Sequence, residues 1–143
     1  MTFGTRISNT LYTAGQPSKE QLRKLSAEGF RRIIDLRPPL EDHGFDEPSA
    51  AASAGLEYLS LPVASEADLT LANVRALDQW LADPARPVTL VHCGSSNRVG
   101  ALLALRAGWL QAAGAEAALD IGRAAGLKGM EPAVRTLLAG QPT

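Results

Sequence analysis

The chain has 143 residues, of which 45% are hydrophobic and 20% are charged, and its formal net charge is −1. This length and composition predict one folded domain over residues 1–143 and argue against intrinsic disorder. The balance of 14 basic and 15 acidic residues predicts no broad cationic surface, so we expect neither nucleic acid nor membrane as a partner and expect any anion to be bound locally.

Signals for targeting and for metal binding are absent from the sequence. The first ten residues, MTFGTRISNT, hold no apolar core of a signal peptide, and no stretch approaches the roughly 18 apolar residues of a membrane span. We therefore expect a cytoplasmic protein. The single cysteine can form no disulfide within the chain, and with the two histidines it gives no zinc-ligand spacing, so we expect no metal and no cofactor.

Helix and strand signals alternate through the first part of the chain. A short apolar run covers residues 11–14. Ser18 followed by Gln21 has the capping-box pattern, which predicts a helix from about residue 17 to residue 28. The β-branched run RRIIDL that follows predicts a strand, ended by Pro38.

A loop rich in proline, glycine and acidic residues covers positions 38–56, with a small alanine-rich helix expected near 49–54. Its acidic and histidine side chains could rim a cleft, although such a run is usually a solvated surface. The side chains that could rim a cleft are Glu41, Asp42, His43 and Asp46, and the acidic cluster of this loop also includes Glu47. The segment EYLSLPV then alternates strongly enough to predict a second strand.

The second part of the chain continues the alternation. Thr70 or Asp68 can cap a helix that runs to Ala82, and VTLVH is an apolar run short enough to be a fully buried strand. Helices are expected over three further stretches, 99–112, 115–125 and 131–139, the first of them apolar nearly all round. The sequence therefore predicts an α/β fold with a mostly parallel or mixed central sheet flanked by helices.

The strongest functional signal lies in LVHCGSSNRVGALLAL, where a buried strand leads through a small polar loop into a buried helix. A loop of this kind points backbone N–H groups and the positive end of the helix dipole at one spot, which can bind an anion. Arg98 adds a charged fork that can bind two oxygens of a phosphate or sulfate. The residues expected to bind the anion are Gly94, Ser95, Ser96, Asn97 and Arg98.

Cys93 begins this loop and is the candidate nucleophile. Thiols at a helix N-terminus beside an arginine deprotonate more readily than a free cysteine, which makes them nucleophilic at neutral pH. A lone cysteine at a strand end is more often an inert core residue, but the neighbouring His92, the small loop and Arg98 together favour a functional site. We expect His92 to orient the loop by hydrogen bonds and not to act as a base.

The pattern HCGSSNR resembles the His-Cys-(x)5-Arg loop of protein tyrosine and dual-specificity phosphatases. It looks closest to a bacterial phosphatase-like domain family related to beta-lactamase hydrolase-like proteins. The likeness extends over LYTAGQPSKEQLRKLSAEGFRRIIDLRP, LEYLSLPV and VHCGSSNRVGALLALR. The resemblance implies one dual-specificity-phosphatase-like domain that hydrolyses a phosphorylated small molecule or phosphoprotein through a cysteinyl-phosphate intermediate.

Two features depart from the pattern of the larger superfamily. Only four residues separate Cys93 from Arg98, where that superfamily has five, and Val99 replaces the hydroxyl residue that helps the thiolate to leave. The four-residue spacing also resembles the active-site loop of rhodanese-type sulfurtransferases, which would use Cys93 as a persulfide. Val99 favours a second alternative, a non-catalytic phosphate- or phosphopeptide-binding module.

Phosphate-ester hydrolysis of this kind needs an acid to protonate the leaving oxygen. In the family that the chain resembles, this acid lies after a strand and before the helix that leads into the loop. The corresponding segment here is VASEADLT. Asp68 and Glu66 are the candidates, with capping of the next helix as the structural alternative for Asp68. Arg37 could guide an anionic substrate, but we weigh a structural salt bridge, for instance with Asp35, ahead of that role.

Overall fold

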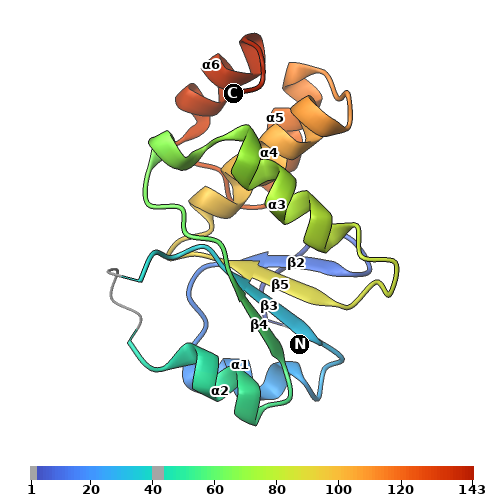
Figure 1. Ribbon diagram of the computed structural model, residues 1–143, viewed down its shortest axis with the longest axis vertical. Helices are drawn as coiled ribbons and strands as arrows, with labels where there is room; N and C mark the ends of the chain where they lie inside the picture. The colour runs from blue at the N-terminus through green and yellow to red at the C-terminus, as the bar shows by residue number, and fades with distance from the viewer. Residues whose placement is uncertain (1–2, 40–43) are drawn as a thin grey trace.

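A computed structural model describes residues 3–39 and 44–143 of the chain. The strands in this part form one mixed sheet in the order β1-β2-β5-β3-β4 (Figure 1). They are β1 (Thr5–Arg6), β2 (Leu11–Ala14), β3 (Arg32–Asp35), β4 (Glu57–Ser60) and β5 (Thr89–His92). The short β1 pairs antiparallel with β2, and every other pairing is parallel, which confirms the predicted α/β fold with a mixed sheet.

Helices cover both faces of this sheet. They are α1 (Lys19–Leu25), α2 (Glu47–Ser53), α3 (Leu71–Leu81), α4 (Asn97–Leu110), α5 (Ala115–Ala124) and α6 (Glu131–Ala139), with a short 3₁₀ turn, η1 (Glu66–Asp68), before α3. Figure 1 shows α1 and α2 on one side and α3 to α6 on the other. Because successive strand residues point to opposite faces, Ile33 and Leu90 pack towards α1 and α2 while Ile34 and Val91 pack towards α4.

The local signals in the sequence explain most of the helix boundaries. The Ser18 and Gln21 capping box is present and starts α1. This helix ends at Leu25, three residues before the predicted end, because the chain turns through Gly29 (φ +98°) and the Phe30 N–H bonds back to the Leu25 carbonyl at 3.0 Å.

In the functional part of the chain, one predicted helix cap is confirmed and one predicted boundary changes. Thr70, one of the two predicted alternatives, is the N-cap of α3, and Asp68 is not. Helix α4 begins at Asn97, two residues before the predicted start, because the Gly100 N–H already bonds to the Ser96 carbonyl at 3.0 Å. The strand β1 and the turn η1 were not predicted, since both are too short to show a periodic pattern.

The register of the parallel strands brings three chain segments to one edge of the sheet. His92 in β5 lies opposite Ala14 in β2 and opposite Asp35 in β3. The residues that follow each of these strands therefore leave the sheet side by side. This edge, at the carboxyl ends of the strands, is where open α/β sheets place their ligands.

No helix in the described part of the chain is long and apolar enough to cross a membrane.

Candidate active site

Cys93 lies at the centre of this edge, directly after β5. Its side chain is 0% exposed, and its backbone N–H points to the Ala14 carbonyl at 3.4 Å. The next residue, Gly94, accepts the backbone N–H of Gln16 at 3.1 Å. Two hydrogen bonds thus hold the start of the loop against the end of β2, and the Cys93 side chain is buried with the hydrophobic core.

The loop enters α4 through a left-handed residue. Ser96, the N-cap of α4, has φ +70° and ψ −6°. Within residues 3–39 and 44–143, no backbone carbonyl accepts the N–H groups of Gly94, Ser95, Ser96 and Asn97. Unpaired N–H groups at a helix N-terminus, together with the helix dipole, make a binding site for an anion.

The side chains of two loop residues make contacts outside the loop. The Ser96 hydroxyl donates to the Ala125 carbonyl at 2.5 Å. The Asn97 side-chain oxygen accepts the backbone N–H groups of Lys128 and Met130 at 2.7 and 3.3 Å. These side chains anchor the loop to the segment between α5 and α6, and the Ser96 hydroxyl uses its proton in this contact.

Arg98 occupies the first turn of α4 and is half-buried. Its Nη1 donates to the Val63 carbonyl at 2.9 Å, in the segment that follows β4. The guanidinium is therefore held between the loop and the segment that carries the candidate acids. Its role as an anion-binding fork stays a prediction.

The two candidate acids are the first and last residues of the turn η1. The Asp68 carboxylate accepts the Ala64 N–H at 2.8 Å, and the Asp68 side chain is partly exposed. Glu66 is exposed and lines a pocket of about 440 Å³ together with Leu137 of α6. Asp68 thus stabilises its own turn, and its carboxylate and that of Glu66 both stay candidates for the acid.

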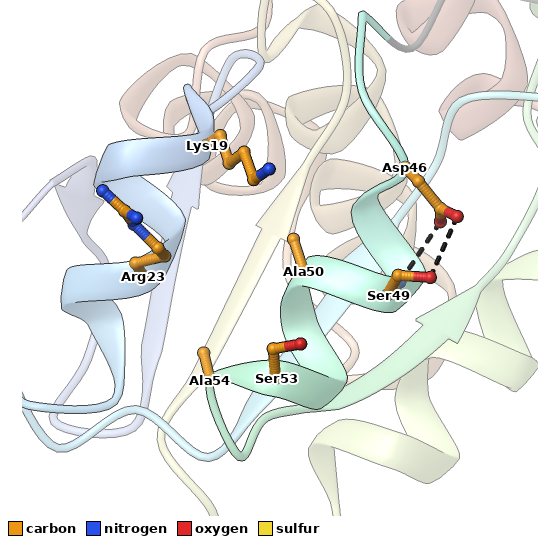
Figure 2. A pocket seen from close by; sticks show the side chains of 7 residues that line it. All are labelled: Lys19, Arg23, Asp46, Ser49, Ala50, Ser53 and Ala54. Atoms are coloured by element: carbon orange, nitrogen blue, oxygen red, sulfur yellow. Dashed lines mark hydrogen bonds between the residues drawn. The ribbon is translucent and has the colours of Figure 1, made fainter.

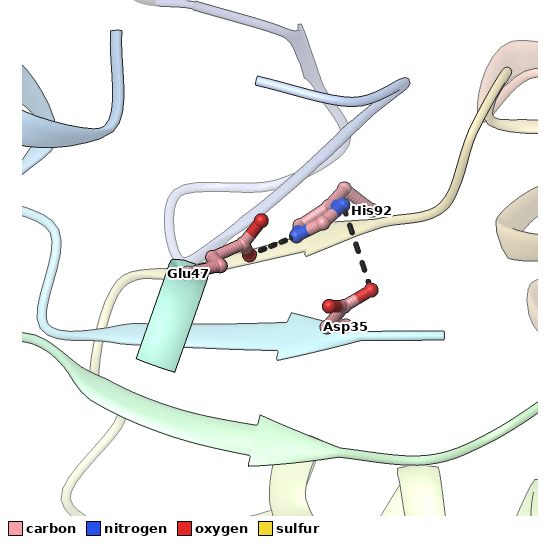
Figure 3. Close-up of side chains that lie close together, drawn as sticks. All are labelled: Asp35, Glu47 and His92. Carbon is pink, nitrogen blue, oxygen red and sulfur yellow. Dashed lines mark hydrogen bonds and ion pairs between the residues drawn. The ribbon is translucent and has the colours of Figure 1, made fainter. Parts of the chain in front are cut away.

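A buried ion-pair network lies beneath the loop. Arg37 is 1% exposed and binds Asp35 with two hydrogen bonds of 3.0 Å, from Nε and from Nη2. The same Nη2 donates to Glu47 at 2.9 Å, and Tyr58 donates its hydroxyl to Asp35 at 2.6 Å. His92 Nε2 lies 2.5 Å from the Glu47 carboxylate, as Figure 3 shows.

Charges in this network shift the ionisation of its members. Burial alone would raise the pKa of Asp35, but hydrogen bonds from Arg37 and Tyr58, with His92 nearby, hold that pKa below its ordinary value. Burial, and then the hydrogen bond to Asp35, raises the pKa of Tyr58. Burial alone would lower the pKa of Arg37, but Asp35 and Glu47 raise it. Asp35 and Arg37 are therefore a charged pair and Tyr58 is a neutral donor.

Three residues of this network have side chains of the kinds that bind metals. Ligand atoms of Asp35, Glu47 and His92 lie within 4.8 Å of one another. Arg37 donates to both carboxylates and so already places a positive charge against their oxygens. A metal cation at the same point would be repelled by the guanidinium, so we interpret the cluster as an ion-pair network.

The structure separates the predicted site residues into two groups. Cys93, Arg98 and the loop residues meet at the edge of the sheet, and His92 is buried beneath them. Arg37 is buried and paired with Asp35 and Glu47, which fits the predicted salt bridge. Its role in guiding a substrate stays a prediction, and the burial of the side chain argues against that role. Glu41, Asp42 and His43 lie outside the described residues.

Glu47 is the residue that sequence reasoning missed. We grouped it with the solvated acidic cluster, yet it is 0% exposed and touches His92. A signal was present, because Glu47, Ala50 and Ala51 follow helical spacing and form the buried face of α2. Asp46, its neighbour, is the N-cap of α2.

Two pockets bear on substrate access. A groove of about 380 Å³ runs beside the loop, where Ser95 and Ser96 face Gly15 and Lys128. A second pocket of about 450 Å³ lies between α1 and α2, with Lys19 pointing into it from α1 (Figure 2). The groove touches the loop at Ser95 and Ser96 but not at Cys93 or Arg98, and no residue of the 93–98 loop lines the second pocket.

A cysteine-to-arginine loop at the carboxyl edge of this mixed sheet places the chain among the protein tyrosine phosphatase-like α/β proteins. The chain belongs to the family described as "DSP-PTPase phosphatase fused to NAD+ Kinase", whose model matches residues 3–131. This agrees with the family resemblance that the sequence predicts. That model covers the loop, both candidate acids and the buried network.

Known proteins support the assignment. The chain is 39% identical over 104 residues to a beta-lactamase hydrolase-like protein of Agrobacterium fabrum, which covers 70% of this chain and 24% of the relative. The chain therefore spans about a quarter of that relative's length.

Two solved structures share the fold. One is TpbA of P. aeruginosa in complex with pTyr, with a TM-score of 0.68, 20% identity, and coverage of 95% of this chain and 82% of that one. The other is PTPMT1 in complex with PI(5)P, with a TM-score of 0.70, 19% identity, and coverage of 94% and 93%.

Proposed function

We propose that this chain is a cysteine-dependent phosphatase that hydrolyses a phosphate monoester through a cysteinyl-phosphate intermediate on Cys93. The observation that carries the proposal is the loop itself. Four backbone N–H groups follow Cys93 and lead into the N-terminus of α4, and no backbone carbonyl of the described residues accepts them. A phosphoryl group bound by these N–H groups would lie directly above the thiol.

The reaction takes two steps. The Cys93 thiolate attacks phosphorus, the bond from phosphorus to the ester oxygen breaks, and Asp68 or Glu66 gives that oxygen its proton. Water then attacks the phosphorus of the cysteinyl-phosphate and gives a proton to the carboxylate formed in the first step. The P–S bond breaks, which restores the Cys93 thiolate, and inorganic phosphate leaves. Arg98 and the loop N–H groups stabilise the charge on the phosphoryl oxygens in both steps.

Val99 bears on the second step. Its apolar side chain is fully buried, so it offers the departing Cys93 thiolate no hydroxyl donor. We therefore expect the intermediate to form faster than it breaks down. Rapid mixing with an aryl phosphate should show a burst of released phenol followed by slower turnover.

The substrate class follows from the relatives and from the groove. TpbA is seen with pTyr and PTPMT1 with PI(5)P, so both a phosphoprotein and a phosphorylated small molecule are reasonable substrates for this chain. A groove of about 380 Å³ lies beside the loop residues Ser95 and Ser96 and is a candidate space for part of either substrate. Lys128 and Arg123 line this groove, although Arg123 is already paired with carboxylates.

The decisive experiment is Cys93→Ser assayed on an aryl phosphate. We expect the parent to hydrolyse the ester and the variant to lose hydrolysis while it still binds inorganic phosphate, because the loop N–H groups are unchanged. A variant that hydrolyses the ester at the parental rate would rule out the mechanism. Phosphate binding by a parent that turns over no ester would point to the non-catalytic binding module.

The four residues between Cys93 and Arg98 keep one rival function open. In a rhodanese-like sulfurtransferase, the thiolate would take sulfur from thiosulfate to form a persulfide and release sulfite. Cyanide would then accept the sulfur as thiocyanate. We expect no thiocyanate from the purified protein, and its formation without phosphatase activity would favour the rival.

A further inference from the structure

Glu47 reaches across from α2 to the histidine that precedes the candidate nucleophile. It is the first residue of α2, it is 0% exposed, and its Oε2 lies 2.5 Å from Nε2 of His92 (Figure 3). Its other oxygen, Oε1, accepts Nη2 of Arg37 at 2.9 Å and Nε2 of Gln16 at 3.2 Å. Side chains from three other segments of the chain thus meet on one buried carboxylate.

The contact with Glu47 determines where His92 carries its proton. An ionised carboxylate can only accept hydrogen bonds, so Nε2 of His92 has to be the donor. On the other side of the ring, Nδ1 lies 3.9 Å from Asp35 Oδ1 and has no hydrogen-bond partner in the described part of the chain. The hydrogen bond from Nε2 to Glu47 therefore holds the orientation of this ring.

The same carboxylate is connected to the loop by a second route. His92 is bonded covalently to Cys93, and Gln16 uses its backbone N–H to bind the Gly94 carbonyl at 3.1 Å. Loss of the Glu47 carboxylate would therefore release a support on each side of Cys93. The side chain of Glu47 does not itself line the groove beside the loop.

We propose that Glu47 is a positioning residue, which holds His92 in one tautomer and orientation and thereby keeps Cys93 in the geometry needed for attack. The catalytic consequence rests on the proposed function, whereas the effect on His92 does not. The charged and titratable groups near the ring are Glu47 on α2, Asp35 and Arg37 at the end of β3, and Tyr58 of β4, which binds Asp35.

The test is Glu47→Gln, which keeps the size of the side chain but has one acceptor oxygen and one donor NH₂. If the oxygen keeps Arg37 and Gln16, the NH₂ group faces Nε2 of His92, and the ring has to carry its proton on Nδ1. Nitrogen NMR of the histidine side chain should show a protonated Nε2 in the parent and a protonated Nδ1 in the variant. The chain has two histidines, so the variant His43→Gln identifies the His92 signals.

The kinetic readout separates positioning from binding. Because small misplacement of a reacting group slows the chemical step, we expect kcat of Glu47→Gln to fall about 10- to 100-fold. KM and the affinity for inorganic phosphate should change little, since the loop N–H groups and Arg98 are retained. Tyr58→Phe is the matched control, because it removes a hydrogen bond to Asp35 from the same network without touching His92. It should leave Nε2 protonated.

Each outcome decides the proposal. A parent spectrum with Nε2 unprotonated overturns it, even if Glu47→Gln does not fold. A folded variant with Nε2 still protonated, or with an unchanged kcat, also overturns it, as does a tautomer change in Tyr58→Phe. If the parent hydrolyses no ester, the proposed function fails, while the spectra of the parent and variant still decide the role of Glu47.

Discussion

The side-chain oxygen of Asn97 accepts the backbone N–H of Lys128 at 2.7 Å, which joins the first residue of α4 to the turn between α5 and α6. The same oxygen accepts the Met130 N–H at 3.3 Å, and the adjacent Ser96 hydroxyl donates to the Ala125 carbonyl. The candidate anion loop is therefore supported from outside by a segment that lies about thirty residues further along the chain. This support can be tested separately from the chemistry.

Asn97→Ala should loosen the loop. The change removes the acceptor of the Lys128 and Met130 N–H groups, so we expect a loss of about 0.5–1.5 kcal/mol in the free energy of unfolding. Affinity for inorganic phosphate should fall with it, because the loop is no longer held in one conformation. Urea denaturation and calorimetric titration with phosphate measure the two effects.

Asn97→Asp is the companion variant. It retains an acceptor oxygen for the same two N–H groups but adds a negative charge at the N-terminus of α4, where the phosphate would bind. Stability should stay near that of the parent, while phosphate affinity falls through repulsion. Parental phosphate affinity in both variants would show that Asn97 does not support an anion site.

Gly126→Ala should disturb the loop through a direct clash. Gly126 has φ +112°, and an added Cβ would lie 2.5 Å from Ser96 Oγ. Strain and clash together should cost about 1–3 kcal/mol or more of folding stability and lower the phosphatase rate. Gly29→Ala is the matched control, with φ +98° and no atom within 4 Å of the added Cβ. It should lose stability through strain but keep the parental rate per folded molecule, and equal rate losses in both variants would contradict the idea.

Asp35 should make folding stability depend on acid pH. Its pKa in the folded protein lies below its ordinary value, so the unfolded chain takes up the proton at higher pH than the folded chain does. The stabilisation is therefore complete above the unfolded pKa, about 3.9, and is lost as the pH falls through the folded value. Urea unfolding at a series of pH values should show a steep fall below about pH 4.

Asp35→Asn supplies the comparison. It should be less stable than the parent at neutral pH, because it weakens the partner of the buried Arg37, and it should lose less stability on acidification. The variant Glu116→Gln should retain the steep loss of stability at acid pH, because water screens the ion pairs of this exposed carboxylate. If Asp35→Asn and the parent lose stability in parallel, Asp35 is not the titrating group.

The general acid can be identified through the leaving group. Removal of the acid should slow hydrolysis of an alkyl phosphate by about 10²- to 10⁴-fold and should spare an aryl phosphate whose leaving group needs no proton. The variants Asp68→Asn and Glu66→Gln should differ in this respect, and only one should lose the basic limb of the pH profile. No selective loss in either variant would remove both from the mechanism.

Much of the fold can be read from local signals. The capping box at Ser18 and the stops and caps of the helices depend on neighbouring residues, and so does the buried run of β5. The cysteine loop is equally local, because Cys93 and Arg98 lie within six consecutive positions at a junction of strand and helix. Strand β1 escaped prediction because two residues carry no period.

The sequence by itself determined the α/β class, the order of elements, the family and the candidate nucleophile, since each depends on short-range patterns or on a continuous motif. Only the tertiary structure decided that Glu47 belongs beneath the loop, that Arg37 is buried in ion pairs, and that Asn97 anchors a distant turn. The contacts of Glu47 with Arg37 and His92, and those of Asn97 with Lys128, join residues 10 to 45 positions apart. Strand order and the packing of the helices bring these residues together. A charged side chain looks the same in sequence whether it faces water or a buried partner, and the difference arises only when the sheet and helices pack.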